Sequence, residues 1–318
     1  FGETAKYKRI LTGSPITQSP LDLYAQCAFL SKRLLGYDSY WSFQGRFAII
    51  KQQRMGSVSF NQVVGFKNLE ELTQKLKIFS HRTTKKEALG LPPKIYTTRQ
   101  VDLTSTQKQQ YKSMKETSAV FFEDGGMVTA PEVMTRLLRL QQLLCGYLVT
   151  DDGETIELAN NRIKVMMEVI EEMDGKVIIW SRFRHDIKKI KSELCKIYGS
   201  GSVVTYYGDT SQEDRDSAIL RIQNDPKTRF FVSNPQTGGR GITLTAATNV
   251  IYYSNDFNLE SRKQSEDRCH RIGQDESVLY VDLVCPNTVD VHIVKSLLQK
   301  DKIAGKTLGE EVLEWLTV

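Results

Sequence analysis

The 318-residue chain contains no long apolar run and no closely spaced cysteine pair. A transmembrane helix needs about 18 or more consecutive apolar residues, so none is expected. The five cysteines are scattered, outside the C-x(2–4)-C spacing of zinc and redox sites, and the four histidines form no H-E-x-x-H pair. We therefore expect reduced thiols, no metal site and no membrane partner. The setting would be intracellular, a bacterial or host cytoplasm or a eukaryotic nucleus.

The sequence also lacks a phosphate-binding loop. Gly305-Lys306-Thr307 resembles the end of a G-x-x-x-x-G-K-[ST] motif, but Lys300 occupies the position of its first glycine and no predicted strand precedes it. No D-E-x-[HD] tetrad occurs either. Nucleoside triphosphate hydrolysis needs the loop lysine and a magnesium-binding acid, so these residues alone are not expected to hydrolyse ATP.

Charge is distributed unevenly along a chain of otherwise ordinary composition. With 40% hydrophobic and 25% charged residues, it is long enough for about two globular domains. Residues 1–120 contain 19 Lys and Arg against 8 Asp and Glu, whereas residues 121–318 contain 24 against 30. The basic part indicates a polyanionic partner such as a nucleic acid, or else a solvated basic surface.

Residues 176–318 have the pattern of an α/β domain. Short β-branched and aromatic runs alternate with amphipathic helical segments, which predicts a parallel sheet flanked by helices. The predicted strands are Lys176–Ser181, Val203–Gly208, Arg229–Ser233, Asn249–Ser254 and Val278–Val284.

The preceding residues do not complete a second α/β domain. Residues 126–175 predict two helices, with Gly146 ending the first. In residues 1–125 we expect one strand at Lys8–Ser14, a helix near Asp22–Ser31, an aromatic and basic stretch to Phe66, a helix near Leu69–Phe79 and an alternating run at Ile95–Leu103. A single strand with helices cannot close a core, so its partners are expected upstream.

Two segments of the α/β domain carry candidate chemistry. The turn Ser233–Gly241 has three glycines in four positions directly after a strand, which either brings backbone N–H groups close to a phosphate or serves a purely structural turn. Gln264, Arg268 and Arg271 would share one face of a helix over residues 259–272. The two arginines could clamp phosphoryl charge, or they could form salt bridges with neighbouring acids, Glu266 and Asp267.

Together these residues resemble the Swi/Snf-type ATPases of helicase superfamily two. Gln264–Gln274 (QSEDRCHRIGQ) matches motif VI of that family almost letter for letter. Further similarity follows in the family order, with some departures at Pro235, Gln236, Thr243 and Phe257. The similar segments are Leu11–Pro15 (motif III), Phe79–Lys94, Lys176–Phe183 (motif IV), Tyr207-Gly208 with Arg215, and Thr237–Leu244 (motif V).

The resemblance implies a fold and a set of roles. Two RecA-like lobes sandwich ATP with Mg²⁺ in this family. Residues 176–318 would be the second lobe, residues 1–125 a remnant of the first with a basic and aromatic helical insertion, and residues 126–175 a helical protrusion or linker. Arg268 and Arg271 would be arginine fingers, and Gly239, Gly241 and Gln264 would face the nucleotide. The candidate contacts to double-stranded DNA are Ser181, Arg182, Gly208, Thr237 and Phe257.

The short inserts between motifs are typical of a compact phage or bacterial member. We therefore expect the C-terminal motor part of an ATP-dependent DNA translocase or helicase, with the phosphate-binding loop and the Mg²⁺ site in an upstream lobe. The alternative is a non-catalytic nucleic-acid-binding or assembly module that keeps the motor fold. A Rossmann-type transferase fits poorly, because its glycine turn would follow the first strand rather than the third.

Overall fold

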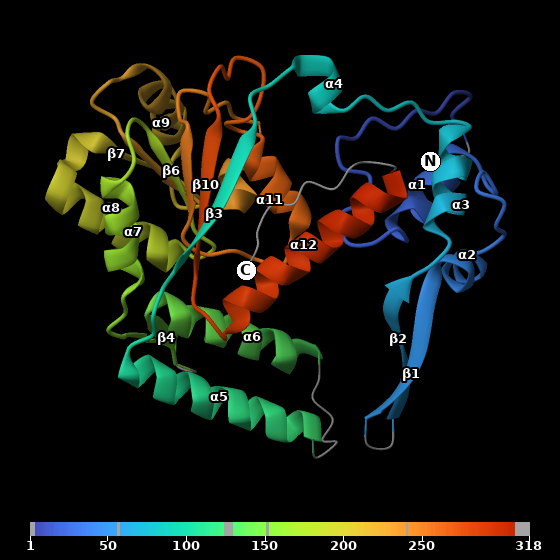
Figure 1. The fold of residues 1–318 in the computed structure, drawn as a ribbon, viewed down its shortest axis with the longest axis horizontal. Helices are drawn as coiled ribbons and strands as arrows, with labels where there is room; N and C mark the ends of the chain where they lie inside the picture. The colour runs from blue at the N-terminus through green and yellow to red at the C-terminus, as the bar shows by residue number, and fades with distance from the viewer. Residues whose placement is uncertain (1–3, 56–57, 124–129, 151–152, 240, 309–318) are drawn as a thin grey trace.

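A six-stranded parallel sheet forms the centre of the molecule (Figure 1). The computed structural model describes residues 4–55, 58–123, 130–150, 153–239 and 241–308. The strand order is β3-β10-β9-β6-β8-β7, and every neighbouring pair is parallel. All five predicted strands are confirmed, as β6 (Val177–Trp180), β7 (Val203–Tyr206), β8 (Phe230–Ser233), β9 (Asn249–Tyr252) and β10 (Val278–Val284).

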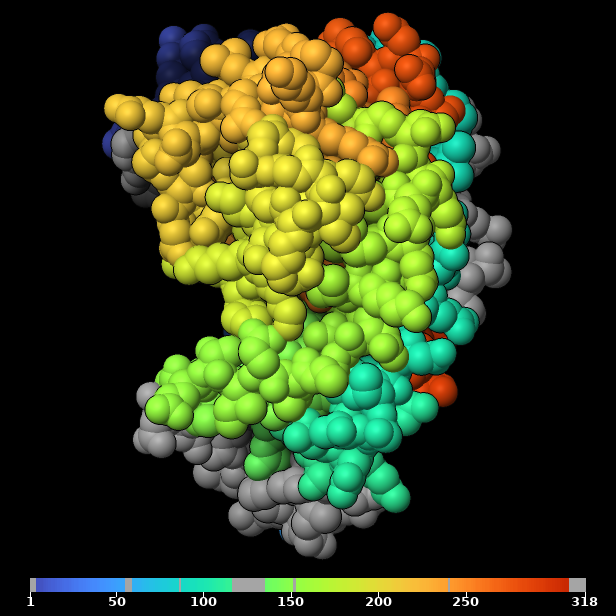
Figure 2. Space-filling view, turned by 90° about the vertical axis from the view of Figure 1, so that its left-hand side faces the viewer, coloured from blue at the N-terminus to red at the C-terminus, as the bar shows by residue number. Residues whose placement is uncertain are grey.

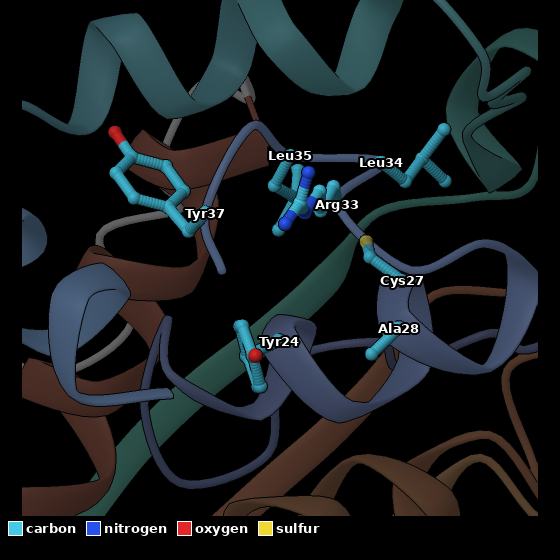
Figure 3. A pocket seen from close by; sticks show the side chains of 7 residues that line it. All are labelled: Tyr24, Cys27, Ala28, Arg33, Leu34, Leu35 and Tyr37. Atoms are coloured by element: carbon cyan, nitrogen blue, oxygen red, sulfur yellow. The ribbon is translucent and has the colours of Figure 1, made fainter. Parts of the chain in front are cut away.

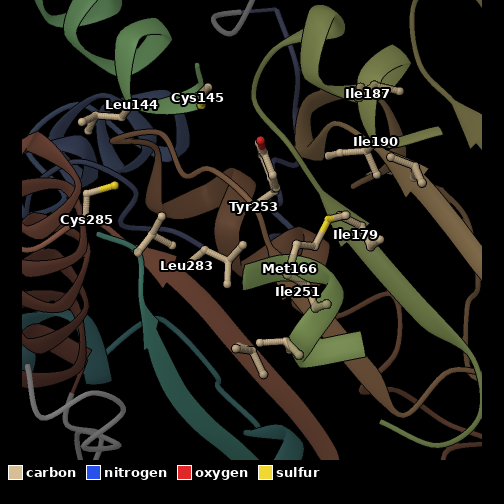
Figure 4. Close-up of a cluster of buried hydrophobic side chains, with 14 of the residues drawn as sticks. Leu144, Cys145, Met166, Ile179, Ile187, Ile190, Ile251, Tyr253, Leu283 and Cys285 are labelled. Carbon is tan, nitrogen blue, oxygen red and sulfur yellow. The ribbon is translucent and has the colours of Figure 1, made fainter. Parts of the chain in front are cut away.

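The sheet is buried on both faces, which explains the continuous apolar runs of its strands. Alternate residues of β6 enter different cores: Ile179 packs with helices α7 and α8, whereas Ile178 and Trp180 pack on the side of α9. Figure 4 shows the first of these cores, with Met166 of α7 and Ile187 of α8 directed toward the strands. The helices around the sheet are α7 (Arg162–Glu171), which precedes β6, α8 (Arg184–Tyr198), α9 (Gln212–Asn224), α10 (Pro235–Gly238) and α11 (Leu259–Glu266), which lie between successive strands, and α12 (Val289–Leu308), which follows β10.

The sixth strand comes from the region predicted as a lobe-one remnant. β3 (Lys94–Gln100) pairs in parallel with β10 along its whole length, from Lys94 opposite Val278 to Gln100 opposite Val284. The predicted alternating run at 95–103 is therefore a strand, but it extends the sheet of residues 176–318. Its half-buried residues alternate with exposed ones, as expected at a sheet edge.

Helices α5 (Ser105–Glu123) and α6 (Ala130–Cys145) pack together below the sheet in Figure 1. Helix α6 ends at Gly146, whose φ of +91° is in the left-handed region that glycine tolerates. A short hairpin of β4 (Tyr147–Val149) and β5 (Thr155–Glu157) follows. The fully buried Arg162 at the start of α7 then ties this region to the sheet, because it pairs with Asp290 and donates to the carbonyl of Leu283.

The N-terminal residues form a small satellite core of their own. It contains α1 (Asp22–Leu30), α2 (Tyr40–Phe47) and α3 (Leu69–Lys77), with Phe43, Phe47 and Leu72 fully buried among them. Helix α12 completes this core with Ala304, and the Thr73 hydroxyl of α3 donates to the carbonyl of Thr307 at 2.6 Å. The sequence predicts that these elements need packing partners from upstream. In the structure the partner is α12, which lies downstream and contributes Ala304 to their core.

Two local expectations for the N-terminal residues were wrong. No strand forms over residues 8–14, where Leu11 is 96% exposed, because no neighbouring strand offers its backbone a hydrogen-bonded partner. The aromatic and basic stretch instead contains an unpredicted antiparallel hairpin, β1 (Ala48–Met55) and β2 (Val58–Phe66). A short helix, α4 (Lys85–Leu89), precedes β3. Within the described residues, no helix combines the length and the apolar character needed to cross a membrane.

Candidate functional site

The glycine turn after β8 is packed too tightly for any side chain at two of its positions. A Cβ at Gly238 would lie 2.3 Å from the Ser233 hydroxyl oxygen, and one at Gly239 would lie 2.1 Å from the Pro235 carbonyl oxygen. Gly241 has a φ of +71° and open space around its Cα. The first two glycines therefore serve the turn itself, and Gly241 leaves backbone accessible at the end of it.

The segment from Gln264 to Gln274 is helical only as far as Glu266. Beyond α11 the chain forms successive tight turns, with the Arg268 amide donating to Ser265 and the Gln274 amide donating to Arg271. The predicted helix over residues 259–272 was therefore too long. The amides of Arg268, Cys269 and Gln274 donate to carbonyls three residues back rather than four, so the hydrogen-bond ladder of an α-helix does not continue.

These two segments meet at the carbonyl oxygen of Ile242. The Nη1 atoms of Arg268 and Arg271 both donate to it, each at 3.2 Å, and Nε of Arg268 donates to the Gln264 carbonyl at 2.9 Å. The Leu244 amide donates to the carbonyl of Arg268 at 2.9 Å and fixes the segments side by side. Gln264, Arg268 and Arg271 are thus brought together as expected, but by turns rather than by one helix face.

The charge of the two arginines is not balanced by carboxylates. Neither guanidinium forms an ion pair in the described parts of the chain, and both side chains are partly exposed. Partial burial lowers the pKa of Arg268, and the neighbouring positive charge of Arg271 lowers it further. Two adjacent cations of this kind form a site for an anion, because an anion would remove their mutual repulsion.

The acids expected to neutralise these arginines pair elsewhere. Glu266 is bound by Arg262 at 2.7 Å and by Lys94 of β3 at 2.8 Å, and Asp267 is bound by Lys85 of α4 at 2.6 Å. Burial raises the pKa of Glu266, but the charges of Lys94 and Arg262 outweigh it and lower the value to about 2. The salt-bridged alternative for Arg268 and Arg271 is therefore contradicted.

Residues 4–147 match the SNF2-related domain, and residues 161–273 match the helicase conserved C-terminal domain. The chain belongs to the Swi/Snf-type ATPase family. Segments 237–244 and 264–274, which resemble motifs V and VI, lie in or at the end of the matched C-terminal domain, and the Ile242 carbonyl is one contact between them.

Several relatives of this SNF2-related chain are known, each matching nearly all of it. It is 26% identical to an uncharacterized ATP-dependent helicase, MG018 of Mycoplasma genitalium, over 95% of the chain and 28% of that protein. It is 27% identical to the bovine DNA annealing helicase and endonuclease ZRANB3, over 96% of the chain and 27% of that protein. The chain therefore spans less than a third of the length of these relatives.

Solved structures of other proteins are similar to this chain. The Sulfolobus solfataricus SWI2/SNF2 ATPase core in complex with double-stranded DNA is 26% identical, with a TM-score of 0.53, covering 93% of this chain and 64% of that one. The C-terminal part of the Fun30 ATPase domain shares the fold, with 17% identity and a TM-score of 0.54 over 70% of this chain and 100% of that one. The expected fold class, a RecA-like parallel sheet flanked by helices, is confirmed.

The predicted DNA contacts lie at or near the carboxyl ends of the strands. Ser181 is fully buried, and its hydroxyl donates to Asp186 at 2.9 Å, so it holds the loop after β6 rather than lining the surface. The partly buried Arg182 bonds Gln141 of α6, and Thr237 is half-buried in α10. Near this edge, Figure 2 shows the surface hollowed between the yellow segment, which includes α9, and the green segment, which includes β4 and β5.

The remaining two candidates have structural neighbours that limit them. Gly208 lies beneath Arg184, whose Nη2 would be 2.7 Å from an added Cβ, and its carbonyl accepts from Arg215. Phe257 packs against the sheet core, and its carbonyl accepts from Lys300 at 2.8 Å. The DNA contacts of Gly208 and Phe257 therefore stay predictions.

A buried ion pair that sequence reasoning missed holds motif VI on the sheet. Arg262 is 3% exposed, donates to both carboxylate oxygens of Asp282 on β10 at 2.6 and 2.9 Å, and lies 3.4 Å from the centroid of the Tyr252 ring. The Asn255 amide donates to the same carboxylate at 2.7 Å. An arginine followed four residues later by Glu266, on a helix with few apolar residues, was the available sequence signal.

Three further features of the described residues do not form a ligand site. The pocket in Figure 3, between α1 and the loop that follows it, has a volume of about 10 Å³, close to the minimum for one water molecule. In the described ranges, no group of three or more His, Cys, Asp or Glu residues could hold a metal ion. The Gly305-Lys306-Thr307 sequence lies in the last turns of α12 and not between a strand and a helix. It is therefore not a phosphate-binding loop.

Proposed function

We propose that these residues form the second motor lobe of a DNA-dependent ATPase that translocates on double-stranded DNA, and that Arg268 and Arg271 are its arginine fingers. The observation that carries the proposal is their convergence on the Ile242 carbonyl without a carboxylate partner. The relatives named above, an ATP-dependent helicase and a DNA annealing helicase, support ATP and DNA as the ligands.

The chemistry follows from the properties of arginine. A transferring phosphoryl group spreads negative charge over its oxygens, and a guanidinium offers planar, permanently charged donors to them. The Ile242 carbonyl holds both Nη1 atoms near each other before the anion binds, so little side-chain entropy is lost on binding. The buried Arg262–Asp282 pair keeps this segment on the sheet.

The phosphate-binding loop and the Mg²⁺ that accompanies ATP would be held by a separate P-loop lobe of the same protein. The described residues offer no metal ligand cluster, and the sequence has no complete G-x-x-x-x-G-K-[ST] motif. Without that lobe, the 318 residues are expected to show no ATP hydrolysis. Closure of the cleft would bring Arg268 and Arg271 to the phosphates, and reopening would move this lobe along DNA.

The DNA side of the lobe would be the hollowed carboxyl edge of the sheet. Arg182 and Thr237 are accessible there, and contacts from such groups to phosphate oxygens carry no sequence preference. Ser181 would act as a positioning residue for Arg182, because its hydroxyl lies 3.1 Å from the Ser254 hydroxyl that accepts from the Arg182 amide.

The test is DNA-stimulated ATP hydrolysis in a protein that joins this chain to a P-loop lobe. Arg271→Ala should abolish turnover and leave the dissociation constant for duplex DNA unchanged. Lys191→Ala, which removes an exposed cation from α8, is the matched control and should change neither. Turnover that survives in Arg271→Ala, or robust hydrolysis by the 318 residues alone, would contradict the proposal.

A second candidate is a non-catalytic nucleic-acid-binding or assembly module with the same fold. The excess of 11 positive charges in residues 1–120 favours it, because that charge does not require ATP to bind a polyanion. The two candidates differ in one measurement. The module would bind duplex DNA with a strong salt dependence while the complete protein hydrolysed no ATP.

A further inference from the structure

The unpredicted hairpin β1–β2 joins the satellite core only at its base, through Ala48, Val63 and Phe66. It extends from the satellite core toward the side of the molecule where α5 and α6 lie (Figure 1). Between Ile50 and Val63, the described side chains on both faces of the hairpin are exposed, at residues 51–54 and 59–62. A two-stranded ribbon without a packing partner is marginal in stability. The exposed side chains of this hairpin pack in no core, so they are available for a surface contact.

One face of the hairpin is a continuous polar row. Partners across an antiparallel pair point to the same side, and so do residues two apart along a strand. Gln52 is paired with Asn61, and Arg54 is paired with Ser59, so all four side chains share one face. The opposite face carries Lys51, Gln53, Phe60 and Gln62.

The charge of this region has one sign. No Asp or Glu occurs between Asp38 and Glu70, whereas four Lys and Arg residues do. Two of them, Lys51 and Arg54, lie on the hairpin and form no ion pair with any carboxylate in the described part of the chain. Such a ribbon complements a polyanion and repels acidic surfaces.

We infer that β1–β2 is a DNA-contacting ribbon whose Gln52–Asn61 face enters a groove of the duplex. The major groove admits a two-stranded β-ribbon, and arginine, glutamine and asparagine are the side chains that hydrogen-bond base edges there. Arg54, on the same face, binds a flanking phosphate, whereas Lys51, on the opposite face, adds only long-range attraction to the duplex. The inference rests on the proposed function for its DNA partner, but it assigns a contact outside the motor motifs.

Binding of a fluorescent 20-base-pair duplex to the full 318-residue chain, followed by anisotropy at several salt concentrations, tests the charge. Each phosphate contact contributes about 0.9 to the slope of log affinity against log salt, or roughly eightfold in affinity at 0.1 M salt relative to 1 M. Arg54→Ala should therefore lower the slope by about 0.9 and weaken binding roughly eightfold, and Lys51→Ala should lower it by less. Lys191→Ala, in the middle of α8, removes the same single charge and should change the slope by less than half as much as Arg54→Ala.

Two matched double variants, each removing two side-chain amides, test which face of the hairpin contacts the duplex. Gln52→Ala/Asn61→Ala should weaken binding about fivefold or more without changing the salt slope, because neutral contacts release no counterions. Gln53→Ala/Gln62→Ala removes two amides from the opposite face and should leave binding unchanged. Equal effects of the two amide pairs, or none from either, would overturn insertion into the groove.

The outcomes separate this inference from the proposed function. If the unaltered chain binds duplex DNA and the hairpin variants bind equally well, the inference is wrong and the motor proposal stands. If the unaltered chain binds no duplex, both lose their DNA partner. Hairpin variants that retain DNA binding but lose self-association in sedimentation would assign the ribbon to a second copy of the chain and overturn the inference. The circular dichroism of each variant should match that of the unaltered chain, since all altered side chains are exposed.

Discussion

The buried Arg262–Asp282 pair predicts an asymmetric loss of stability when either partner is removed. Arg262→Met leaves the Asp282 carboxylate, which is 0% exposed, with only the Asn255 amide among the contacts described above. Asp282→Asn leaves Arg262 with a second carboxylate, that of Glu266 at 2.7 Å. Removing one partner of a buried pair and stranding the other charge costs about 3–5 kcal/mol.

We therefore expect Arg262→Met to lower the free energy of unfolding by about 3–5 kcal/mol, the full cost of stranding Asp282. Asp282→Asn should cost only about 1.5–3 kcal/mol, the value of hydrogen bonds to a charged group, because Glu266 still neutralises Arg262. In the double variant the stranded carboxylate is absent, so its loss should be smaller than the sum of the single losses by about 0.5–3 kcal/mol.

The assay is urea unfolding followed by far-UV circular dichroism, with the slope of free energy against urea checked for constancy. A loss from Arg262→Met below about 1 kcal/mol would refute the reasoning, because it would mean that Asp282 is solvated or neutralised after the change. So would a loss from Asp282→Asn as large as that from Arg262→Met. Lys191→Ala on the exposed face of α8 is the control and should be neutral.

Three further predictions concern the free energy of unfolding. Gly239→Ala should lower the free energy of unfolding by about 1–3 kcal/mol, because the added Cβ would meet a backbone carbonyl. Gly45→Ala is the control: the position is exposed in α2, nothing lies within 4 Å of the added Cβ, and the change should be neutral or stabilising. Equal urea midpoints for the two variants would contradict this prediction. Ser211→Ala should cost about 1 kcal/mol by removing the acceptor for the Asp214 amide at the start of α9, and Ser211→Thr should retain most of it in the same unfolding assay. The pKa of Glu266 is lowered to about 2, so its contribution is complete above the unfolded value of 4.5 and is lost as pH falls from there toward 2. Lys94→Met should flatten the fall in unfolding free energy across that window, and an unchanged profile would show that Lys94 does not hold Glu266 ionised.

The strands of the sheet could be predicted because burial on both faces requires continuous apolar runs. Val177–Trp180 and Phe230–Ser233 are entirely buried, and no other pattern of residues satisfies such a position. The strand order could not be predicted in the same way. β3 joins β10 from about 180 residues away, and only the pairing itself shows that Lys94 and Tyr96 reach Glu266.

The proximity of Gln264, Arg268 and Arg271 could be predicted from residue type and spacing, but its geometry could not. The two arginines meet at the Ile242 carbonyl, a backbone atom that no side-chain pattern marks, and Arg268 also donates to the Gln264 carbonyl. The hairpin escaped prediction because Lys51–Arg54 is uniformly polar. A strand exposed on both faces has no apolar alternation to reveal it.

The contact between α3 and α12 also sets an order of events during synthesis. Thr73 and Thr307 are 234 residues apart, and α12 supplies one side of the satellite core. At roughly 5–20 residues per second, the ribosome needs on the order of 10–50 s to make the intervening chain. Throughout that interval the apolar side of α3 has no partner from α12, so the satellite core stays incomplete and its apolar side chains remain open to a chaperone until α12 has been made.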